Sequence, residues 1–311
     1  MTPPTLATLL ARPVPVVINP RSRRGAAAQP ALDAGLRAAD VTPVFVDPGD
    51  DLRAALTEVL ADAPPLVLVG GGDGTIGCAA DLVAHTDTVL GVVPLGTAND
   101  FARTLEIDPD PVRAIEQLLT GRIVDVDLGR AGRSAFLNVA SLGFSVAVTE
   151  RLTARSKKHL GPLAYPWATL RAYRSAGAFS ARLHFPDGDH PDLELDGLLQ
   201  IAVGNGVHYG GGNTVSPTAS VDDHLLDVYA IERGRLREHL SIARLLRDGS
   251  LVEHDRVHHV VTRRVAISTD EPMPVNLDGE IAESSPLTFE VERNAVHVVV
   301  PAHSRAARYD G

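Results

Sequence analysis

Short apolar runs alternate with segments of helical periodicity over residues 14–125 of the chain. The expected strands are residues 14–20, 41–47, 65–71 and 88–96, and the expected helices are residues 31–39, 51–62, 76–84 and 100–105. Strands that alternate with helices in this way are typical of βαβ units on a parallel sheet that is covered on both faces. The pattern therefore predicts a three-layer α/β domain with ligand-binding loops at the carboxyl ends of its strands.

After residue 125 the pattern changes to spaced β-like runs that are separated by turn residues. These runs are residues 134–144, 179–185, 198–205, 225–232, 258–268, 272–278 and 287–301. They predict an all-β second domain, a mostly antiparallel sandwich with helical insertions around residues 150–175 and 236–248. We expect an α/β domain over residues 1–127 and a β-sandwich domain over residues 128–300. A tail, residues 301–311, can pack on the first domain.

The charge of the chain narrows the classes of partner. Its 311 residues carry a net charge of -10 at pH 7, which disfavours general nucleic-acid binding because that needs a basic face. The single cysteine, Cys78, excludes an internal disulfide and a cysteine-based zinc site, and fits a reducing compartment. No signal peptide is evident, and no apolar run approaches the roughly 20 residues of a spanning helix. We therefore expect a cytoplasmic protein.

A glycine-rich loop, GGGDGT at residues 70–75, follows the expected strand 65–71. Consecutive glycines present backbone N–H groups with little side-chain bulk, and the following helix adds its N-terminal dipole, so the loop suits a phosphate. Asp73 would repel a bare phosphate, but it fits a nucleotide whose Mg²⁺ bridges the two groups. The alternative is a tight turn in which Asp73 caps the helix at Thr75 or Ile76.

A second loop, PLGTANDFAR at residues 94–103, ends the expected strand 88–96. With it the sequence resembles the diacylglycerol kinase catalytic family of lipid kinases, which includes sphingosine kinases and related bacterial enzymes. The matching segments also include NPRSRRG at 19–25, FLNVASLGF at 136–144, GNGVHYGGGNTVSPTASVDDHLLDV at 204–228 and NLDGE at 276–280. The resemblance runs from about Val16 to Pro301. Because NAD kinases share the GGDGT loop, the combination of motifs carries the specificity.

The resemblance implies an enzyme that uses ATP and Mg²⁺ to phosphorylate a primary hydroxyl of a lipid. The expected acceptor is diacylglycerol and the product phosphatidic acid, a reaction of phospholipid biosynthesis, with the active site in the interdomain cleft. Asp73 would be the carboxylate closest to the catalytic metal. The implied nucleotide site consists of Asn19, Pro20, Arg21, Ser22, Gly25, Gly71, Gly72, Asp73, Gly74, Thr75 and Thr97.

Two features near these loops have more than one interpretation. Asn99 and Asp100 are better interpreted as caps of the helix that follows than as ligands. In the family, the loop after the second strand often carries a threonine that contacts the nucleotide, whereas VFVDPGDD at residues 44–51 has none. Asp47 or the backbone at Gly49 is the candidate replacement.

The NLDGE segment places two carboxylates, Asp278 and Glu280, on either side of Gly279. In extended geometry they point to the same face. By resemblance Glu280 is the general base that accepts the proton of the attacking hydroxyl, and Asp278 orients Glu280 or aids the metal. The alternative is an ordinary type I′ hairpin turn built on Asp-Gly.

The segment ASVDDHLLD, residues 219–227, resembles a structural magnesium site of bacterial family members. The resemblance implies Asp223 as the side-chain ligand, with Ser220 and Leu225 as main-chain carbonyl donors. The family usually has glycine where this chain has His224, and that glycine can serve a positive φ. Asp222 is an alternative ligand, and a surface Asx turn is the alternative interpretation.

Residues 151–179 gather both lysines of the chain, Lys157 and Lys158, with several arginines, the only tryptophan and two tyrosines. Such a basic, aromatic segment can dock on anionic lipid, so we expect peripheral membrane association, and Pro162 and Pro166 would break it into a helical elbow. The alternative is a partly solvated insertion that covers the sandwich.

Three histidines, His254, His258 and His259, suggest a metal site, but surface or strand-end positions are favoured because no third ligand is evident. The expected partners are ATP and a lipid at a membrane surface, without nucleic acid, and homologues make a homodimer plausible. Two rival functions remain. One is an NAD kinase or another kinase with a soluble substrate, and the other is a noncatalytic nucleotide- or lipid-binding regulator on the same fold.

Overall fold

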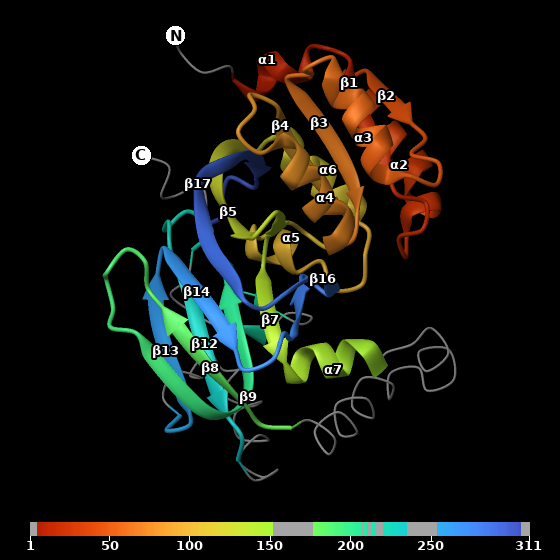
Figure 1. The fold of residues 1–311 in the computed structure, drawn as a ribbon. Coiled ribbons are helices and arrows are strands. Elements are labelled where there is room, and N and C mark those ends of the chain that lie inside the picture. The colour runs from red at the N-terminus through yellow and green to blue at the C-terminus, as the bar shows by residue number, and fades with distance from the viewer. Residues whose placement is uncertain are drawn as a thin grey trace.

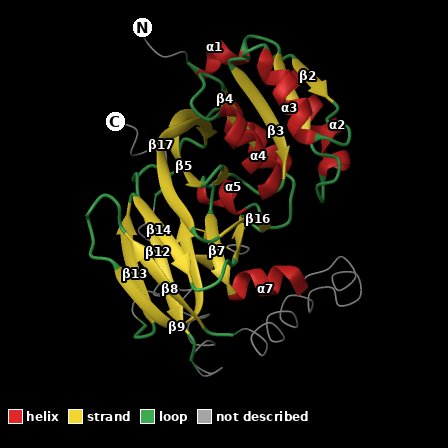
Figure 2. Ribbon diagram, viewed as in Figure 1, coloured by secondary structure: helices red, strands yellow, loops and turns green. Residues whose placement is uncertain are grey.

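The computed structural model describes residues 5–151, 177–206, 208–209, 213–214, 220–234 and 254–305. Figure 1 shows an α/β unit that begins the chain and a β-rich unit that follows it. Figure 2 shows how the two units differ, since most helices surround the sheet of the first unit while strands dominate the second. The predicted fold class, a three-layer α/β domain followed by a β-sandwich-like domain, is confirmed.

Four strands of the first unit are parallel neighbours in the order β4-β3-β1-β2. They are β1 Val14–Ile18, β2 Pro43–Val46, β3 Leu66–Gly71 and β4 Val89–Pro94. The helices of this unit are α1 Leu6–Leu10, α2 Gly25–Ala38, α3 Leu52–Ala61, α4 Asp73–Val83, α5 Asp100–Thr104 and α6 Pro111–Leu119. The parallel βαβ arrangement agrees with the alternating sequence pattern.

The two faces of this sheet are buried under different helices. Along β3, Val67 and Val69 belong to the core cluster that includes residues of α3, α4 and α5, whereas Leu66 and Leu68 belong to the cluster with α1 and α2. Alternate side chains of a strand point to opposite faces, so continuous apolar strands are needed to fill both layers. This explains why the strand sequences are apolar throughout.

The second unit is built from strands that pair mostly antiparallel. They are β6 Ser134–Phe136, β7 Val139–Gly143, β8 Phe179–His184, β9 Leu193–Gly204, β12 Leu226–Glu232, β13 Val257–Thr262, β14 Arg264–Thr269, β15 Pro274–Leu277 and β16 Glu280–Ser284. A short pair, β10 His208–Tyr209 and β11 Asn213–Thr214, forms a separate hairpin. Helix α7, Phe144–Arg151, follows β7.

Two long strands, β5 Arg122–Ala131 and β17 Leu287–Val300, run through both units as an antiparallel pair. The first half of β17 pairs with β14, and its second half lies parallel to β4 at Val298. The register between β5 and β17 shifts between Glu292 and Val296, which is a bulge in the middle of the ribbon. One sheet therefore continues from the α/β unit into the β unit, and its central ribbon joins them.

The boundaries of several elements differ from the predictions. The predicted strand 258–268 is two strands, of which β13 pairs with β12 and β14 pairs with β8. Helix α7 begins at Phe144, the last residue of the predicted strand 134–144. Strands β5 and β16 were not predicted. Helix α6 was also missed, although Asp110 caps it through the N–H groups of Val112 and Arg113 and Pro111 opens it.

Several predictions fall on residues outside the described ranges. These are the helical insertion at 236–248, most of the insertion and basic segment at 151–179 with Lys157 and Lys158, and the tail after Arg305. Within the described residues, the helices are all too short or too polar to span a membrane.

Candidate active site

Two loops at the carboxyl ends of β1 and β3 are tied together by Asn19. Its backbone N–H donates to the carbonyl of Gly70 at 2.9 Å, and its side-chain Nδ2 donates to Thr75 Oγ1 at 2.8 Å. The Asn19 Oδ1 accepts the N–H of Arg21 at 2.9 Å, so one amide side chain joins the NPRSRRG loop to the first turn of α4. The structure thus brings these predicted nucleotide positions together.

The rest of the NPRSRRG loop folds back on itself. Ser22 Oγ donates to the carbonyl of Asn19 at 2.7 Å, and Arg21 forms an ion pair with Asp50 in the loop after β2. Gly25 is required by packing, because a Cβ there would lie 2.1 Å from the Asn19 carbonyl oxygen. Pro20 is exposed at the turn. A compact loop results, and its Arg21 and Arg24 side chains bond to Asp50 in the loop after β2 and to the carbonyls of Pro94 and Pro109.

The loops after β3 and β4 touch through glycine. A Cβ on Gly96 would lie 2.4 Å from Gly72 Cα, so neither loop tolerates a side chain at the contact. Thr97 follows this contact and is exposed in the β4–α5 loop. The loops after β1, β3 and β4 therefore meet at one edge of the sheet, where parallel sheets bind their ligands.

Asp73 does not cap α4, contrary to the alternative interpretation of the glycine loop. Gly72 is the N-cap residue, and its carbonyl accepts the N–H groups of Thr75 and Ile76 at 2.9 and 3.0 Å. The Asp73 carboxylate instead accepts the N–H of Phe101, in α5, at 3.2 Å. Burial raises the pKa of Asp73, and the charge of Asp100 adds to the increase. A carboxylate held this way gains from a nearby cation.

The expectation that the Asn99 side chain caps α5 is wrong. Asn99 stands at the N-cap position with φ +51°, but its side chain makes no cap hydrogen bond. Its Oδ1 accepts the N–H of Gly96 at 2.8 Å and its Nδ2 donates to the Gly96 carbonyl at 3.3 Å. Asp100 is the first residue of the helix and is buried. The amide therefore closes the β4–α5 loop, because its left-handed backbone turns it toward Gly96.

The loop after β2 lacks a threonine, and its candidate replacements form a turn of their own. Asp47 Oδ1 accepts the N–H of Gly49 at 3.0 Å, and Gly49 has a positive φ of 56°. A Cβ on Gly49 would meet no atom within 4 Å. Their role toward a nucleotide remains a prediction.

The NLDGE segment is a two-residue hairpin turn between β15 and β16, not an extended segment. Leu277 pairs with Glu280, while Asp278 and Gly279 have positive φ angles of 47° and 102°, as a type I′ turn requires. The expectation that extended geometry puts Asp278 and Glu280 on one face is therefore wrong. Asn276 Oδ1 accepts the N–H of Gly279 at 2.9 Å and closes the turn.

Asp278 anchors this hairpin to the segment between β6 and β7. Its carboxylate accepts the N–H groups of Leu137, Asn138 and Val139 at 2.6, 3.0 and 2.9 Å. Burial raises the pKa of Asp278 to about 6, although the three N–H donors favour the charged form, and the negative charge of Asp73 adds to the increase. The turn geometry thus directs Asp278 into the protein and leaves Glu280 at the start of β16.

Glu280 reaches the first turn of α4. A Cβ on Gly74 would lie 3.1 Å from Glu280 Oε1, so the carboxylate stands directly against this glycine and beside Asp73. Asp73, Gly74, Asp278 and Glu280 line one cavity of about 190 Å³ between the two units. The structure therefore brings together, from positions two hundred residues apart, the three carboxylates that the sequence predicted as catalytic.

The same cavity has further walls that the sequence analysis missed. They are Arg53, Gly77, Cys78, Asp81, Arg133, Ser134, Ala135, Leu277 and Ala282. Gly77 and Asp81 follow Asp73 at intervals of four residues, so they share one face of α4, and this spacing could have revealed them. Arg53 and Arg133 come from α3 and the β5–β6 turn, and no motif marks them.

The segment 220–225 forms a turn around Asp223. Its two carboxylate oxygens accept the N–H groups of Ser220 and Leu225 at 2.8 and 3.0 Å, and burial raises the pKa of Asp223 to about 6. His224 adopts a φ of +63°, where glycine is more usual, and donates its N–H to the buried Asp127 at 2.6 Å. Backbone N–H groups of the turn itself thus supply hydrogen bonds to both oxygens of the Asp223 carboxylate.

These geometries can be tested against the implied Mg²⁺. At Asp73, a carboxylate whose pKa is raised by burial is a single oxygen ligand that suits this ion, and it lines the same cavity as Asp278 and Glu280. Around Asp223, both oxygens already accept hydrogen bonds within the turn, and nowhere in the described part of the chain do three or more His, Cys, Asp or Glu residues gather in a metal-binding arrangement. Magnesium at Ser220, Asp223 and Leu225 remains a prediction.

Two of the three histidines belong to strand β13, as expected for strand positions. His258 Nε2 lies 3.0 Å from Glu232 Oε1 and His259 Nε2 lies 2.7 Å from Asp227 Oδ1, both on the neighbouring β12. His254 precedes the strand, and its Nδ1 accepts the N–H of Arg256. The pairing with carboxylates accounts for the polar side chains on this strand.

A glycine loop at a helix N-terminus, faced by a carboxylate from a second domain, is an arrangement that suits phosphoryl transfer. The family model described as the diacylglycerol kinase catalytic domain matches residues 13–131, and the one described as the YegS C-terminal NAD kinase beta sandwich-like domain matches residues 138–300. The chain belongs to the diacylglycerol kinase catalytic family and is of its YegS-like lipid kinase type.

Relatives agree with this assignment, and solved structures share the fold. A protein named "Probable lipid kinase YegS-like" from Pseudomonas syringae is 34% identical over 259 residues, 82% of each chain. Its namesake from Pseudomonas aeruginosa is 35% identical over 261 residues, 83% of this chain and 84% of the relative. A Bacillus anthracis diacylglycerol kinase structure has a TM-score of 0.70 at 20% identity, covering 93% and 96% of the two chains, and therefore shares the fold. A second structure from that organism has a TM-score of 0.78 at 24% identity, covering 93% and 95%.

Proposed function

We propose that the protein uses ATP and Mg²⁺ to phosphorylate the primary hydroxyl of diacylglycerol at a membrane surface, forming phosphatidic acid. The observation that carries the proposal is the contact between Glu280 and Gly74, since it puts a carboxylate from the second domain at the first turn of α4. A phosphate held by that turn would have its terminal phosphoryl group next to a potential base. Membership in a lipid kinase family supports the lipid as acceptor.

The nucleotide half of the site would be the group of loops joined by Asn19. The N–H groups of Gly72, Asp73 and Gly74 lie at the start of α4, where the helix dipole favours phosphate, while Gly71 ends β3 and the Thr75 N–H is already bonded to the Gly72 carbonyl. Asp73 would hold the Mg²⁺, which when bound neutralises charge on the phosphate oxygens. The compact NPRSRRG loop would cover the nucleotide from the β1 side.

The acceptor half would be the hairpin that carries Glu280. The acceptor hydroxyl gives its proton to the Glu280 carboxylate while its oxygen forms a bond to the γ-phosphorus, and the bond from that phosphorus to the β–γ bridging oxygen breaks to release ADP. Asp278 contributes by holding the hairpin, because its three N–H donors fix the turn from which Glu280 projects.

A second cavity supports a lipid as the acceptor. It has a volume of about 530 Å³ and lies beside the start of α7, with Phe144, Ala147, Phe179 and Met273 among its walls. Strand β15 runs from this cavity toward the Glu280 hairpin, a distance of about 13 Å for four residues. Thr269, Asp270 and Glu271 also line the cavity, so an acyl chain would lie along its apolar wall and could leave the hydroxyl end of the lipid at Glu280.

The decisive experiment offers labelled ATP with diacylglycerol, other lipids with free hydroxyls, and NAD, each with and without Mg²⁺. Transfer to diacylglycerol that requires Mg²⁺ is the expected result. Transfer only to NAD would contradict the lipid acceptor, and ATP binding without transfer to any acceptor would favour a noncatalytic regulator. Transfer to another lipid alone would support a lipid kinase but show that its acceptor is not diacylglycerol.

Peripheral membrane association and a cytoplasmic location are part of the proposal, and so is the homodimer. Sedimentation with vesicles of phosphatidylglycerol and of phosphatidylcholine tests the first. Binding to the anionic vesicles that weakens with salt is expected for a basic docking segment, and equal binding to both vesicles would contradict it. Sedimentation equilibrium without lipid tests the dimer.

A further inference from the structure

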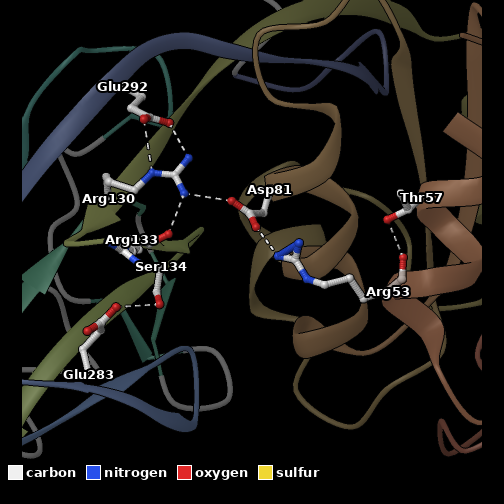
Figure 3. A network of polar contacts seen from close by, with 8 residues as sticks. All are labelled: Arg53, Thr57, Asp81, Arg130, Arg133, Ser134, Glu283 and Glu292. Carbon is white, nitrogen blue, oxygen red and sulfur yellow. Dashed lines mark hydrogen bonds and ion pairs between the residues drawn. The ribbon is translucent and has the colours of Figure 1, made fainter. Parts of the chain in front are cut away.

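A chain of alternating charges crosses from helix α3 to strand β17 (Figure 3). Arg130, on β5, donates from Nε and Nη2 to the two carboxylate oxygens of Glu292 at 3.1 and 2.8 Å. Its Nη1 donates to Asp81 Oδ1, on α4, at 2.8 Å, and the other oxygen of Asp81 accepts from Arg53, on α3. Arg130 thus links the helical layer of the first unit to the ribbon that both units share.

This network differs from the surface ion pairs of the molecule in its burial. The side chains of Arg130, Asp81 and Glu292 are only 15%, 20% and 24% exposed, whereas Arg182 in a pair on β8 is 58% exposed. Exposed pairs contribute little, but a bidentate guanidinium that water reaches poorly holds its partners in a defined geometry. The Arg130 network can therefore fix the position of α4 against β5.

Asp81 is well placed to pass this constraint to the catalytic end of α4. It follows Asp73 by eight residues, about two helical turns, and both lie on the face of the helix that lines the cavity. Because a short helix moves as a rigid unit, holding Asp81 also sets where Asp73 and Gly74 stand.

The residues directly after Arg130 hold the other half of the site. Ser134 Oγ donates to Glu283 Oε1, on β16, at 2.8 Å, as Figure 3 shows. The N–H groups of residues 137–139 bind Asp278 in the hairpin turn. Arg130 Nη1 also donates to the carbonyl of Arg133 at 3.4 Å. Residues 130–139 therefore form a bracket, bound at one end to α4 and at the other to the hairpin that bears Glu280.

We propose that Arg130 is a positioning residue that sets the distance between Glu280 and the first turn of α4 through Asp81 and the 130–139 bracket. Arg130 is absent from the walls of the catalytic cavity, so it acts through these neighbours rather than on the reacting atoms. The inference rests on the proposed function, in which Glu280 is the base. Transfer rates are sensitive to such geometry, because a displacement of about 1 Å can cost a factor of about 10².

The test replaces Arg130 by methionine, which keeps most of its apolar length, and measures kcat and the KM for ATP. We expect kcat to fall about tenfold to hundredfold and KM for ATP to rise less, because the start of α4 shifts against the Glu280 hairpin while the Asn19–Thr75 bond that joins the nucleotide loops is kept. Arg130→Lys should restore part of kcat, since lysine keeps the charge but lacks the fork that binds Glu292. Arg264→Met is the matched control. Arg264, on β14, pairs at 3.2 Å with Glu290 on β17, the strand that also carries Glu292, but it does not reach α4.

A double-mutant cycle with Asp81→Asn identifies the route. Asp81 lines the cavity and can affect turnover directly, so the effect of Asp81→Asn alone does not show whether Arg130 acts through Asp81. If Arg130 acts through Asp81, the double variant loses little more than the larger single loss.

Additive losses, or an unchanged kcat in Arg130→Met with a lowered Tm, would overturn the proposal and leave a purely structural ion pair. If Arg130→Met does not fold, Arg130→Lys and Glu292→Gln apply the same kcat test. A wild-type protein that phosphorylates no lipid would instead overturn the proposed function.

Discussion

The two halves of the proposed catalytic cavity are built in different ways. The half at the start of α4 comes from a continuous motif, with Gly72, Asp73 and Gly74 adjacent in the chain and Asn19 tied to Thr75 by one side-chain bond. The half that carries Glu280 depends on β15, β16, β5 and residues 137–139, which are far apart in sequence. The first half can therefore be recognised from local sequence, whereas the second exists only when the whole sheet has formed.

The difference also assigns separate roles to the two halves. Damage to the α4 half should weaken nucleotide binding, while damage to the Glu280 half should slow transfer with nucleotide binding intact. The following variants test this division, in order of the expected effect.

Glu280→Gln should have the largest effect. Removal of a general base typically lowers turnover by about 10² to 10⁴, and the amide keeps the shape that packs against Gly74. The measurement is kcat with diacylglycerol beside the Kd for ATP, which should hardly change. Glu194→Gln, on an exposed side chain of β9, is the control. Unchanged turnover in Glu280→Gln would remove this residue from the mechanism.

Asn19→Ala should raise the KM for ATP by about fivefold to thirtyfold. The side chain makes one bond to Thr75 and one to Arg21, and each bond contributes about 1 kcal/mol to the arrangement of the loops. Turnover at saturating ATP should change much less. A large drop in kcat with a constant KM for ATP would contradict the assignment of nucleotide binding to the α4 half and of transfer to the Glu280 half.

Gly74→Ala should slow transfer about tenfold without destabilising the protein. A Cβ there meets Glu280 Oε1 at 3.1 Å, so the carboxylate must shift by a few tenths of an ångström, while alanine suits a helix better than glycine. Thermal unfolding and kcat are the two measurements. Gly35→Ala in α2, where the new Cβ makes an ordinary contact at 3.8 Å, should keep kcat unchanged. If Gly74→Ala and Gly35→Ala have the same kcat, Glu280 does not lie against Gly74 in solution.

Asp278→Asn should change the pH dependence of stability as well as lower stability at every pH, because the asparagine NH₂ cannot accept the N–H groups that both Asp278 oxygens accept. The folded protein raises the pKa of Asp278 to about 6, above the ordinary value near 4, so folding favours the protonated carboxyl. The contribution of Asp278 to the unfolding free energy therefore falls as pH rises from about 4 to about 6 and is constant above. Denaturant titrations of both proteins should show this difference. Parallel curves over that range would mean that the carboxyl has an ordinary pKa.

Local patterns predicted the α/β unit and strand β17 of the ribbon well, but they missed the other ribbon strand, β5. Strands β1 to β4 are apolar throughout and are followed by turn residues, so their number and type were clear. Strand β5 alternates charged and apolar residues at a domain junction and was interpreted as a boundary. Its identity depends on pairing with β17, from Phe289 to Val300, and such pairing leaves no local signal.

The candidate site shows the same limit. Asp73 and Glu280 could be proposed from their motifs. The predicted mechanism assumed an extended backbone at Asp278, whereas Asp278 stands in a hairpin turn with a positive φ. An Asp-Gly pair suits both a catalytic strand and a hairpin, and the three N–H partners of Asp278 come from residues 137–139. Arg53, Arg130 and Arg133 are isolated arginines in the sequence, and only the fold gives them neighbours.

The sequence by itself determined the two-unit organisation, the glycine loop at the start of α4 and the residue types of the predicted catalytic carboxylates. These properties depend on periodicity, backbone freedom and charge, which act over a few neighbouring residues. The tertiary structure alone decided that Glu280 meets Gly74, that Asp278 turns inward and that Arg130 joins α4 to the ribbon. Each of these contacts joins distant segments, so it depends on the pairing of the long strands and not on the order of residues around it.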